Sequence, residues 1–250
     1  MSDIISLVNH GYKVFTYDFT GTGASSGKRI KGLLQQEIDL KACLNFLTNN
    51  SEFKNDNFLL YGHSMGAYAI ARNQGYVKNI KSSVIISGFD NPFTVLLNLA
   101  KKEIKHYKLV YLPLIIAIII NQGMPINKSA HKKISISTAP ILIIHGTNDE
   151  IVPFKTMSIT AYKNKIKNAN AKYLNISEKY HDTHNSIIAS TECKLYQEQK
   201  EKIYKNTLEQ TKNESLAQKA FLEDLDKFKY NSANEKLMNV IDNFFQESLK

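Results

Sequence analysis

A serine between two glycines is the residue of this chain best placed for covalent chemistry. The motif GHSMG, residues 62–66, follows the apolar run NFLLY and precedes AYAIARNQG, whose composition is helical up to Gly75. A strand, a sharp turn and a helix in this order form a nucleophile elbow, in which small neighbours let the backbone strain and project the serine hydroxyl outward. Ser64 is therefore the candidate nucleophile.

A serine hydroxyl needs a histidine base, and the histidine needs a carboxylate that fixes its tautomer. Asp149 follows the apolar run PILIIH, and His184 follows AKYLNIS. The order Ser, Asp, His along the chain is the one that a strand–turn–helix elbow requires. Two alternatives stay open at this point: His181 in place of His184, and Asp90, which follows the run SVIIS, in place of Asp149.

Short apolar segments alternate with amphipathic ones along most of the chain. Continuous apolar runs of this length are typical of a parallel sheet covered on both faces, and the alternation predicts a doubly wound α/β fold. The predicted strands are 12–18, 57–61, 83–87, 140–145 and 171–177, and the predicted helices include 35–48 and 154–167.

Two segments interrupt this alternation and divide the chain into predicted units. Residues 93–137 are too long for a connection between strands, so we expect an inserted helical cap. Residues 191–230 are rich in charges of both signs, which favours a solvated helical excursion. The remaining residues, 1–92, 138–190 and 231–250, form the predicted core and end in an amphipathic helix.

Four segments resemble a known superfamily: GYKVFTYDFTGTGASSG, LLYGHSMGAYAIA, APILIIHGTNDEIVP and HDTHNSI. They are similar to the successive signatures of the α/β-hydrolases, nearest to the esterase, monoacylglycerol-lipase and serine-aminopeptidase-like branch. The resemblance implies that Ser64 is the nucleophile, Asp149 the acid and His184 the base, with the amide of Met65 as one oxyanion donor. THNSI matches the superfamily's last motif better than the residues around His181 do.

The resemblance also predicts a gap at the front of the chain. The segment 12–18 matches the fourth strand of the superfamily, yet only eleven residues precede it, so the first three strands and the loop with the second oxyanion donor are missing. We expect one of two arrangements. Either the chain is part of a longer hydrolase, or it is a truncated relative in which 12–18 pairs directly with 57–61 or a partner chain fills the gap.

The predicted activity is hydrolysis of a carboxylic ester, acyl or lipid-like, through an acyl-enzyme. A catalytically impaired binding protein, or a peptidase or thioesterase of the same fold, is the alternative. The cap run LVYLPLIIAIII, residues 109–120, has 12 residues, fewer than the roughly 20 that cross a membrane. It predicts either a buried cap helix, or an acyl-chain wall or lid that touches a membrane surface.

Composition limits the other classes of function. The net charge is +9, but the seven lysines between residues 101 and 133 interleave with aliphatic residues rather than arginines and aromatics, so a nucleic-acid partner is not expected. The two cysteines, Cys43 and Cys193, indicate no disulfide framework and favour a reducing, cytoplasmic location, and the N-terminus is not typical of a secretory signal. The spacing in GTGASSG does not fit a dinucleotide loop, and we expect no metal and no cofactor.

Overall fold

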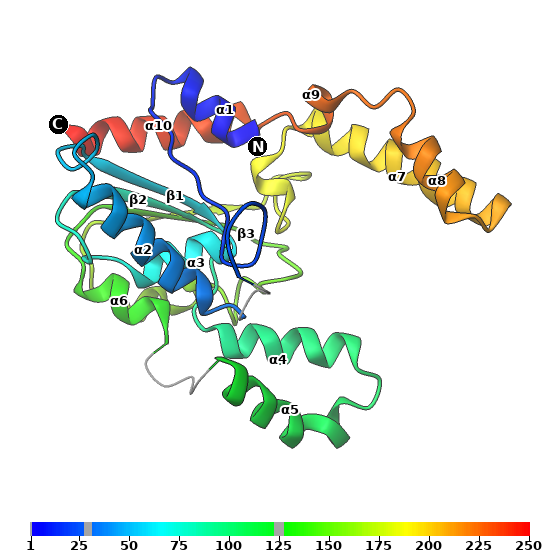
Figure 1. Cartoon of the computed structure of the whole chain (residues 1–250), viewed down its shortest axis with the longest axis horizontal. Coiled ribbons are helices and arrows are strands. Elements are labelled where there is room, and N and C mark those ends of the chain that lie inside the picture. Colours follow the sequence, from blue (N-terminus) through cyan, green and yellow to red (C-terminus); the bar gives the residue numbers. More distant parts are fainter. Residues whose placement is uncertain (1, 28–31, 123–127) are drawn as a thin grey trace.

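A four-stranded parallel sheet lies at the centre of the molecule (Figure 1). The computed structural model describes residues 2–27, 32–122 and 128–250. Neighbouring strands follow the chain order and all run in the same direction. Four of the five predicted strands are thereby confirmed as β1 (Phe58–His63), β2 (Ile80–Ile86), β3 (Ile141–Gly146) and β4 (Ala171–Ile176).

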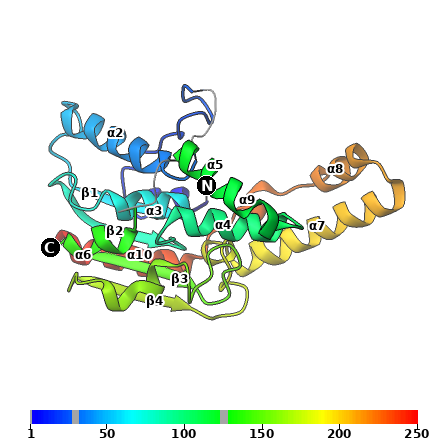
Figure 2. The ribbon, with the colours of Figure 1, turned by 90° about the horizontal axis from the view of Figure 1, so that it is seen from below.

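Helices cover both faces of this sheet, so the predicted α/β layering is confirmed (Figure 2). One layer packs on the side chains of Ile85 and Ile143, and the other packs on those of Val84 and Ile86, because successive side chains of a strand point to opposite faces. The first layer contains α2 (Gln35–Asn49), α3 (Met65–Arg72) and α6 (Ala130–Ile136), and the second contains α1 (Ser2–Asn9) and α10 (Glu235–Leu249).

The predicted strand over 12–18 is wrong. These residues are extended, but the main chain of 13–17 makes no hydrogen bond within the described ranges, and β1 pairs only with β2. A cavity of about 830 Å³ separates the segment from β1, so direct pairing with 57–61 does not occur. Residues that favour strands set an extended backbone, but a ladder forms only where a partner edge lies within hydrogen-bond reach.

The predicted helix over 154–167 is only partly formed. The chain turns at Pro153, whose carbonyl accepts hydrogen bonds from the amides of Met157 and Ser158. A short 3₁₀ helix, η1 (Ile159–Lys165), then begins after Ser158, whose hydroxyl accepts from the amide of Ala161. A second one, η2 (Ser186–Ile188), follows β4.

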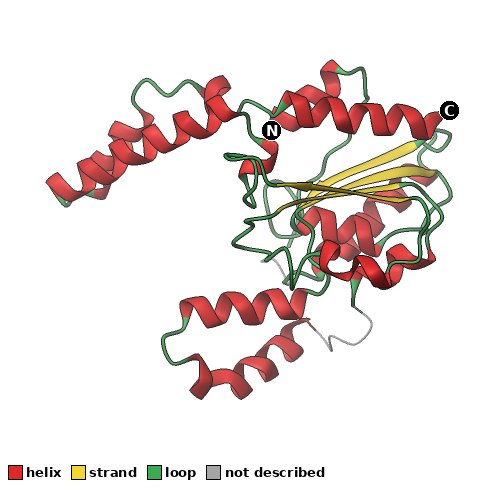
Figure 3. Ribbon diagram, turned by 180° about the vertical axis from the view of Figure 1, so that it is seen from behind, coloured by secondary structure: helices red, strands yellow, loops and turns green. Residues whose placement is uncertain are grey.

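Two helical hairpins project from the sheet layers (Figure 3). The first, α4 (Pro92–Glu103) and α5 (Tyr107–Gln122), begins at Asn91, whose side chain accepts from the amide of Phe93 and caps α4. Within the described residues, no helix is both long and apolar enough to pass through a bilayer. The second consists of α7 (Thr191–Thr211), α8 (Glu214–Leu222) and α9 (Lys227–Tyr230).

The division of the chain into core, cap and excursion stays a prediction, but the packing of α6 bears on its boundary. Ala130 and Ile134 of α6 are fully buried in the layer that contains Tyr68 of α3. The hydroxyl of Tyr68 donates to the carbonyl of Lys128, and Arg72 donates to the carbonyl of Ser129. These contacts hold the segment that leads from the cap into α6 against α3.

The two isoleucines of α6 provide a matched test of this packing. Ile134 is 0 % exposed and Ile136 is 72 % exposed. We expect Ile134→Ala to lower the free energy of unfolding by about 2–5 kcal/mol because it leaves a cavity in the core, and Ile136→Ala to change it by less than about 0.5 kcal/mol. Urea unfolding followed by circular dichroism measures both. Equal effects would mean that α6 belongs to the cap.

Candidate active site

Ser64 occupies a strained turn between β1 and α3. Its φ of 54° and ψ of −112° lie in a region that residues other than glycine rarely adopt. A Cβ on Gly62 would lie 2.7 Å from the carbonyl carbon of Gly66, so the turn closes only with glycine at position 62. A Cβ on Gly66 would meet nothing within 4 Å, so no steric contact among the described residues requires the second glycine of the motif.

The structure brings Ser64, His184 and Asp149 into one line of hydrogen bonds. Oγ of Ser64 is 2.9 Å from Nε2 of His184, and Nδ1 of His184 is 2.7 Å from Oδ2 of Asp149. With its proton on Nδ1, the imidazole donates to the carboxylate and accepts from the serine hydroxyl. The three residues follow β1, β4 and β3, because the carboxyl ends of parallel strands meet at one edge of the sheet.

The carboxylate of Asp149 is held from several sides. Oδ1 accepts from the amides of Ile151 and Val152, at 2.9 and 2.7 Å, and Oδ2 accepts from His184 and lies 3.1 Å from Nε2 of His145. Burial alone would raise the pKa of Asp149, but the hydrogen bonds from His145, His184 and the Val152 amide outweigh it and hold the pKa well below its usual range. Asp149 therefore stays ionised beside His184.

His145 is a site residue that the sequence reasoning missed. Its side chain is fully buried at the end of β3, and Nε2 is shared between Asp149 and the carbonyl of Val152, 2.9 Å away. No hydrogen-bond partner within the described residues reaches its Nδ1. The available signal was a histidine ending an apolar strand four residues before the aspartate.

His63 is a second site residue that the sequence reasoning missed, although it is part of GHSMG. Its Nε2 lies 2.8 Å from the carbonyl of His184, and the two rings are 4.9 Å apart. Burial lowers the pKa of His63, which favours the neutral ring that donates to this carbonyl. The hydroxyl of Ser87 points at the same carbonyl at 3.5 Å. Contacts from β1 and from the residue after β2 thus hold the backbone of His184.

The loop that carries His184 is also fixed by its contact with β3. The amide of Asn148 donates to the carbonyl of Asp182 at 2.9 Å. A Cβ on Gly146 would lie 2.3 Å from this same carbonyl oxygen, so only glycine allows the loop to approach the strand so closely.

The two alternative residues lie in other hydrogen-bond networks. Nε2 of His181 is 3.0 Å from the hydroxyl of Thr191, and its Nδ1 is 3.4 Å from the amide of Asn234. Oδ1 of Asp90 accepts from both the amide and Nδ1 of His131, each at 2.8 Å. Neither residue is hydrogen-bonded to Ser64 or His184 within the described residues.

Met65 is the first residue of α3. The amide at this position of a helix has no partner in the helix's own hydrogen-bond pattern, so it is free to donate to an anion next to Ser64. Among the described residues, no group of three or more histidine, cysteine, aspartate or glutamate side chains is arranged to hold a metal ion.

Comparison with known proteins agrees with this fold and these motifs. Residues 4–89 match the family model Hydrolase_4, described as serine aminopeptidase, S33. The esterase Pf2001 of Pyrococcus furiosus superposes on 99 % of this chain and 75 % of its own, with a TM-score of 0.60 and 16 % identity. The α/β-hydrolase domain-containing protein 17B of Homo sapiens is 30 % identical over 142 residues, or 56 % of this chain and 41 % of its own.

The chain has the α/β-hydrolase fold. The resemblance stated from its sequence motifs, including the esterase and lipase branch, is confirmed. The chain spans less than half the length of these curated relatives, since its match with protein 17C of Mus musculus covers 37 % of that protein.

The low pKa of Asp149 predicts how the stability of this protein depends on pH. The unfolded carboxyl has a pKa of about 3.9, so the stabilisation from the ionised native form is complete above that pH and is lost as the pH falls toward the lower native pKa. We expect Asp149→Asn to be less stable than the wild type at pH 6–7 and the difference to shrink below about pH 4. Urea unfolding between pH 3 and 7 measures this. A constant difference would contradict it.

Proposed function

We propose that this protein is a serine hydrolase that cleaves a carboxylic ester with an acyl or lipid-like group. The observation that carries the proposal is the hydrogen-bonded line from Ser64 through His184 to the buried carboxylate of Asp149. Such a line makes a serine hydroxyl nucleophilic at neutral pH, because the imidazole can take the proton as the oxygen attacks.

In the proposed reaction, Oγ of Ser64 attacks the ester carbonyl while its proton moves to Nε2 of His184. The amide of Met65 donates to the oxyanion of the tetrahedral intermediate. His184 then returns the proton to the departing alcohol, which leaves an acyl group on Ser64. Water attacks this acyl-enzyme, again through His184, and releases the carboxylic acid and the free serine.

Asp149 and the two additional histidines act on His184. The imidazolium that forms during attack is stabilised by the ionised carboxylate of Asp149, and the low pKa of that carboxyl keeps it ionised throughout. His145 orients the carboxylate, and His63 holds the backbone carbonyl of His184. We propose His145 and His63 as positioning residues.

The cap supports an acyl or lipid-like substrate. Residues of α5 spaced three and four apart form one exposed apolar stripe, in which Leu109 is 82 % and Leu112 is 66 % exposed; Ile116 and Ile120 continue it. An apolar stripe of this kind on a short helix is suited to contact acyl chains.

A fluorophosphonate probe tests the proposed nucleophile. We expect the probe to label Ser64 in the folded wild type and to label nothing in Ser64→Ala, because only an activated serine attacks the phosphorus. His184→Gln removes the base and is expected to lower the labelling rate by about 10³-fold or more. Tandem mass spectrometry of the labelled protein locates the site and measures the rate.

His181→Gln is the matched control, since His181 lies three residues from His184 and outside the hydrogen-bonded line. We expect it to keep most of the labelling rate. A folded wild type that stays unlabelled would contradict the proposed activity and favour a binding protein.

The description of the matching family model supports a peptide substrate as a second candidate. Measuring the hydrolysis of acyl esters, acyl thioesters and aminoacyl amides by the unlabelled wild type and by Ser64→Ala separates these substrate classes.

We further propose that the cap contacts anionic membrane surfaces. Four exposed lysines lie on α4 or between α4 and the apolar stripe of α5. They are Lys101, Lys102, Lys105 and Lys108. Apolar side chains that insert between lipids and lysines that meet anionic headgroups together give reversible surface binding.

Vesicle sedimentation tests this contact. We expect the protein to sediment with phosphatidylglycerol vesicles and much less with phosphatidylcholine vesicles, and the bound fraction to fall as salt rises. Leu109→Ser combined with Leu112→Ser is expected to weaken binding by about tenfold or more, because it removes two exposed apolar side chains. Leu216→Ser, on the distant helix α8, is the control and should bind as the wild type does.

A further inference from the structure

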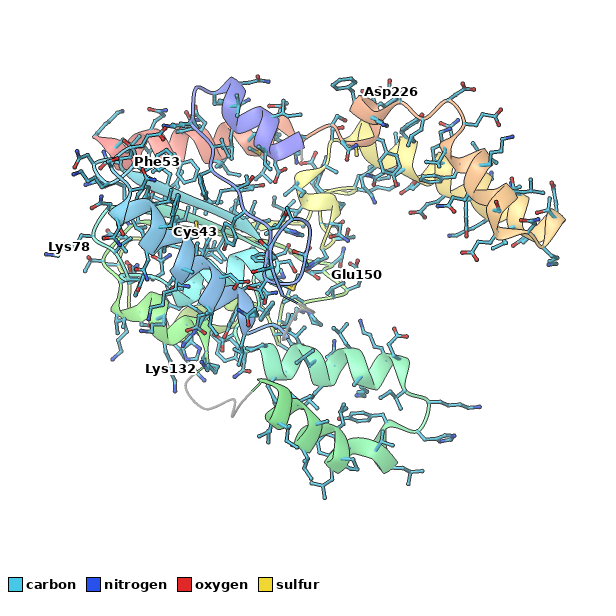
Figure 4. All side chains as sticks on the ribbon, in the orientation of Figure 1. Cys43, Phe53, Lys78, Lys132, Glu150 and Asp226 are labelled. Carbon is cyan, nitrogen blue, oxygen red and sulfur yellow. The ribbon has the colours of Figure 1, made fainter. Side chains whose placement is uncertain are left out.

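A single pair of residues joins the loops that carry Asp149 and His184. Asn148 directly precedes Asp149, and Asp182 lies two positions before His184. The main-chain amide of Asn148 donates to the carbonyl oxygen of Asp182 at 2.9 Å, and its side-chain Nδ2 donates to Oδ2 of Asp182 at 2.5 Å. Glu150, which follows Asp149, marks the first of these loops above the cap helices on the right of Figure 4. We call the two hydrogen bonds the loop clasp.

The loop clasp starts directly from the sheet. Thr147, the residue before Asn148, still donates its amide to the carbonyl of Ile176 in β4 at 2.9 Å, so the pairing of β3 with β4 extends to this point. Gly146 ends β3 and lies so close to the carbonyl of Asp182 that no room is left for a Cβ. Asn148 is therefore positioned by a fully buried strand, and the clasp transmits this position to Asp182.

The turn around His184 depends on the loop clasp for its distance from β3. The amide and the hydroxyl of Thr183 both donate to Oγ of Ser186, at 3.1 and 2.7 Å, which fixes the shape of the turn but not its distance from the strand. Within the described part of the chain, only the ring of His184 and Asp182 form hydrogen bonds between this turn and the loop of Asp149.

Exposure limits what the loop clasp contributes to folding. Asn148 is exposed and Asp182 is half-buried, so water competes for both side chains and the bond between them adds little to the stability of the fold. The geometry of the site is more sensitive. Nε2 of His184 lies 2.9 Å from Oγ of Ser64, and a displacement of about 1 Å at reacting atoms lowers a rate by about 10²-fold.

We propose that Asn148 and Asp182 are positioning residues: the loop clasp sets the distance between β3 and the turn of His184, and it thereby holds Nε2 of His184 against Ser64. Both residues act through His184 in this role. The inference rests on the proposed serine-hydrolase function. It predicts that loss of the clasp lowers the rate of attack by Ser64 far more than it lowers the stability of the fold.

Substitutions of the pair separate the side-chain hydrogen bond from the charge. Asp182→Ala removes the acceptor, and we expect it to lower the maximal labelling rate by about 10- to 100-fold. Asp182→Asn keeps an oxygen that accepts from Asn148 and is expected to stay within about threefold of the wild type. Asn148→Asp sets two carboxylates against each other without a donor, so its loss should be at least as large as that of Asp182→Ala.

Reversal of the hydrogen bond is the decisive variant. Asn148→Asp combined with Asp182→Asn places the donor on residue 182 and the acceptor on residue 148, so the side-chain bond forms again in the opposite direction. We expect this double variant to recover a labelling rate within about threefold of the wild type, although each chain position is changed.

Fluorophosphonate labelling of Ser64 at a series of probe concentrations measures these rates in the 250-residue chain. The maximal rate should fall while the half-saturating concentration stays the same, because His184 takes the serine proton and does not bind the probe. Thermal unfolding followed by circular dichroism should give a Tm within about 3 °C of the wild type for every variant, because the clasp is exposed.

Two matched controls change neighbours of the same functional residues. Glu150→Ala lies next to Asp149 and Asn185→Ala lies next to His184, and both side chains are exposed. Within the described ranges neither side chain forms a hydrogen bond or an ion pair. Both variants should be labelled at the rate of the wild type.

Proton NMR gives a readout that needs no substrate. The Nδ1 proton that His184 shares with Asp149 gives a downfield signal, which is assigned by its absence from His184→Gln. We expect this signal in the wild type, in Asp182→Asn and in the double variant. In Asp182→Ala and Asn148→Asp it should be lost, because the opened hydrogen bond lets the proton exchange with water. An unlabelled wild type that follows this NMR pattern would refute the proposed activity and leave the positioning role standing.

Three results would overturn the positioning role. The first is a wild-type labelling rate and an intact NMR signal in both Asp182→Ala and Asn148→Asp. The second is a double variant that is as slow as Asn148→Asp alone. The third is a fall in Tm of more than about 8 °C that accompanies the loss of labelling, since it would assign the pair a role in folding.

Discussion

The carboxylate of Asp149 is the interaction on which the geometry of the site depends. Both of its oxygens are occupied by donors, two of them amides of the loop that follows β3 and two of them histidines. A buried charge is tolerated only when it is paired and hydrogen-bonded in this way. The same contacts therefore have two effects. They fix the loop after β3, and they hold His184 where its Nε2 lies within hydrogen-bond distance of Ser64.

A parallel sheet explains how residues so far apart in the chain meet. Ser64 and His184 are separated by 120 positions, yet each follows a strand whose carboxyl end lies at the same edge. Close contact between their loops needs glycine at two points. Gly62 allows the elbow to close on Gly66, and Gly146 allows the loop of residue 182 to touch β3. The strain of Ser64 is maintained because these packed loops leave it no alternative.

The sequence predicted the elements whose patterns depend on local composition and burial. The run PILIIH formed a strand that is buried on both faces, and NFLLY formed a half-buried strand at the edge of the sheet. The order Ser64, Asp149, His184 followed from the strand ends. The strand over 12–18 was wrong because its formation depends on a neighbouring edge, which composition does not reveal. His63 and His145 were missed for a related reason: each acts through a contact between loops that are distant in sequence.

The open edge of the sheet and Ser64 are structurally linked through the turn between β1 and α3. His63 and Gly66 flank Ser64 on its two sides, and both line the cavity beside β1. Because Nε2 of His63 also contacts the carbonyl of His184, this one side chain joins the edge strand β1 to the loop that carries His184. The geometry of the hydrogen-bonded line of Ser64, His184 and Asp149 therefore depends on the position of β1 at the edge of the sheet as well as on the buried strand β3.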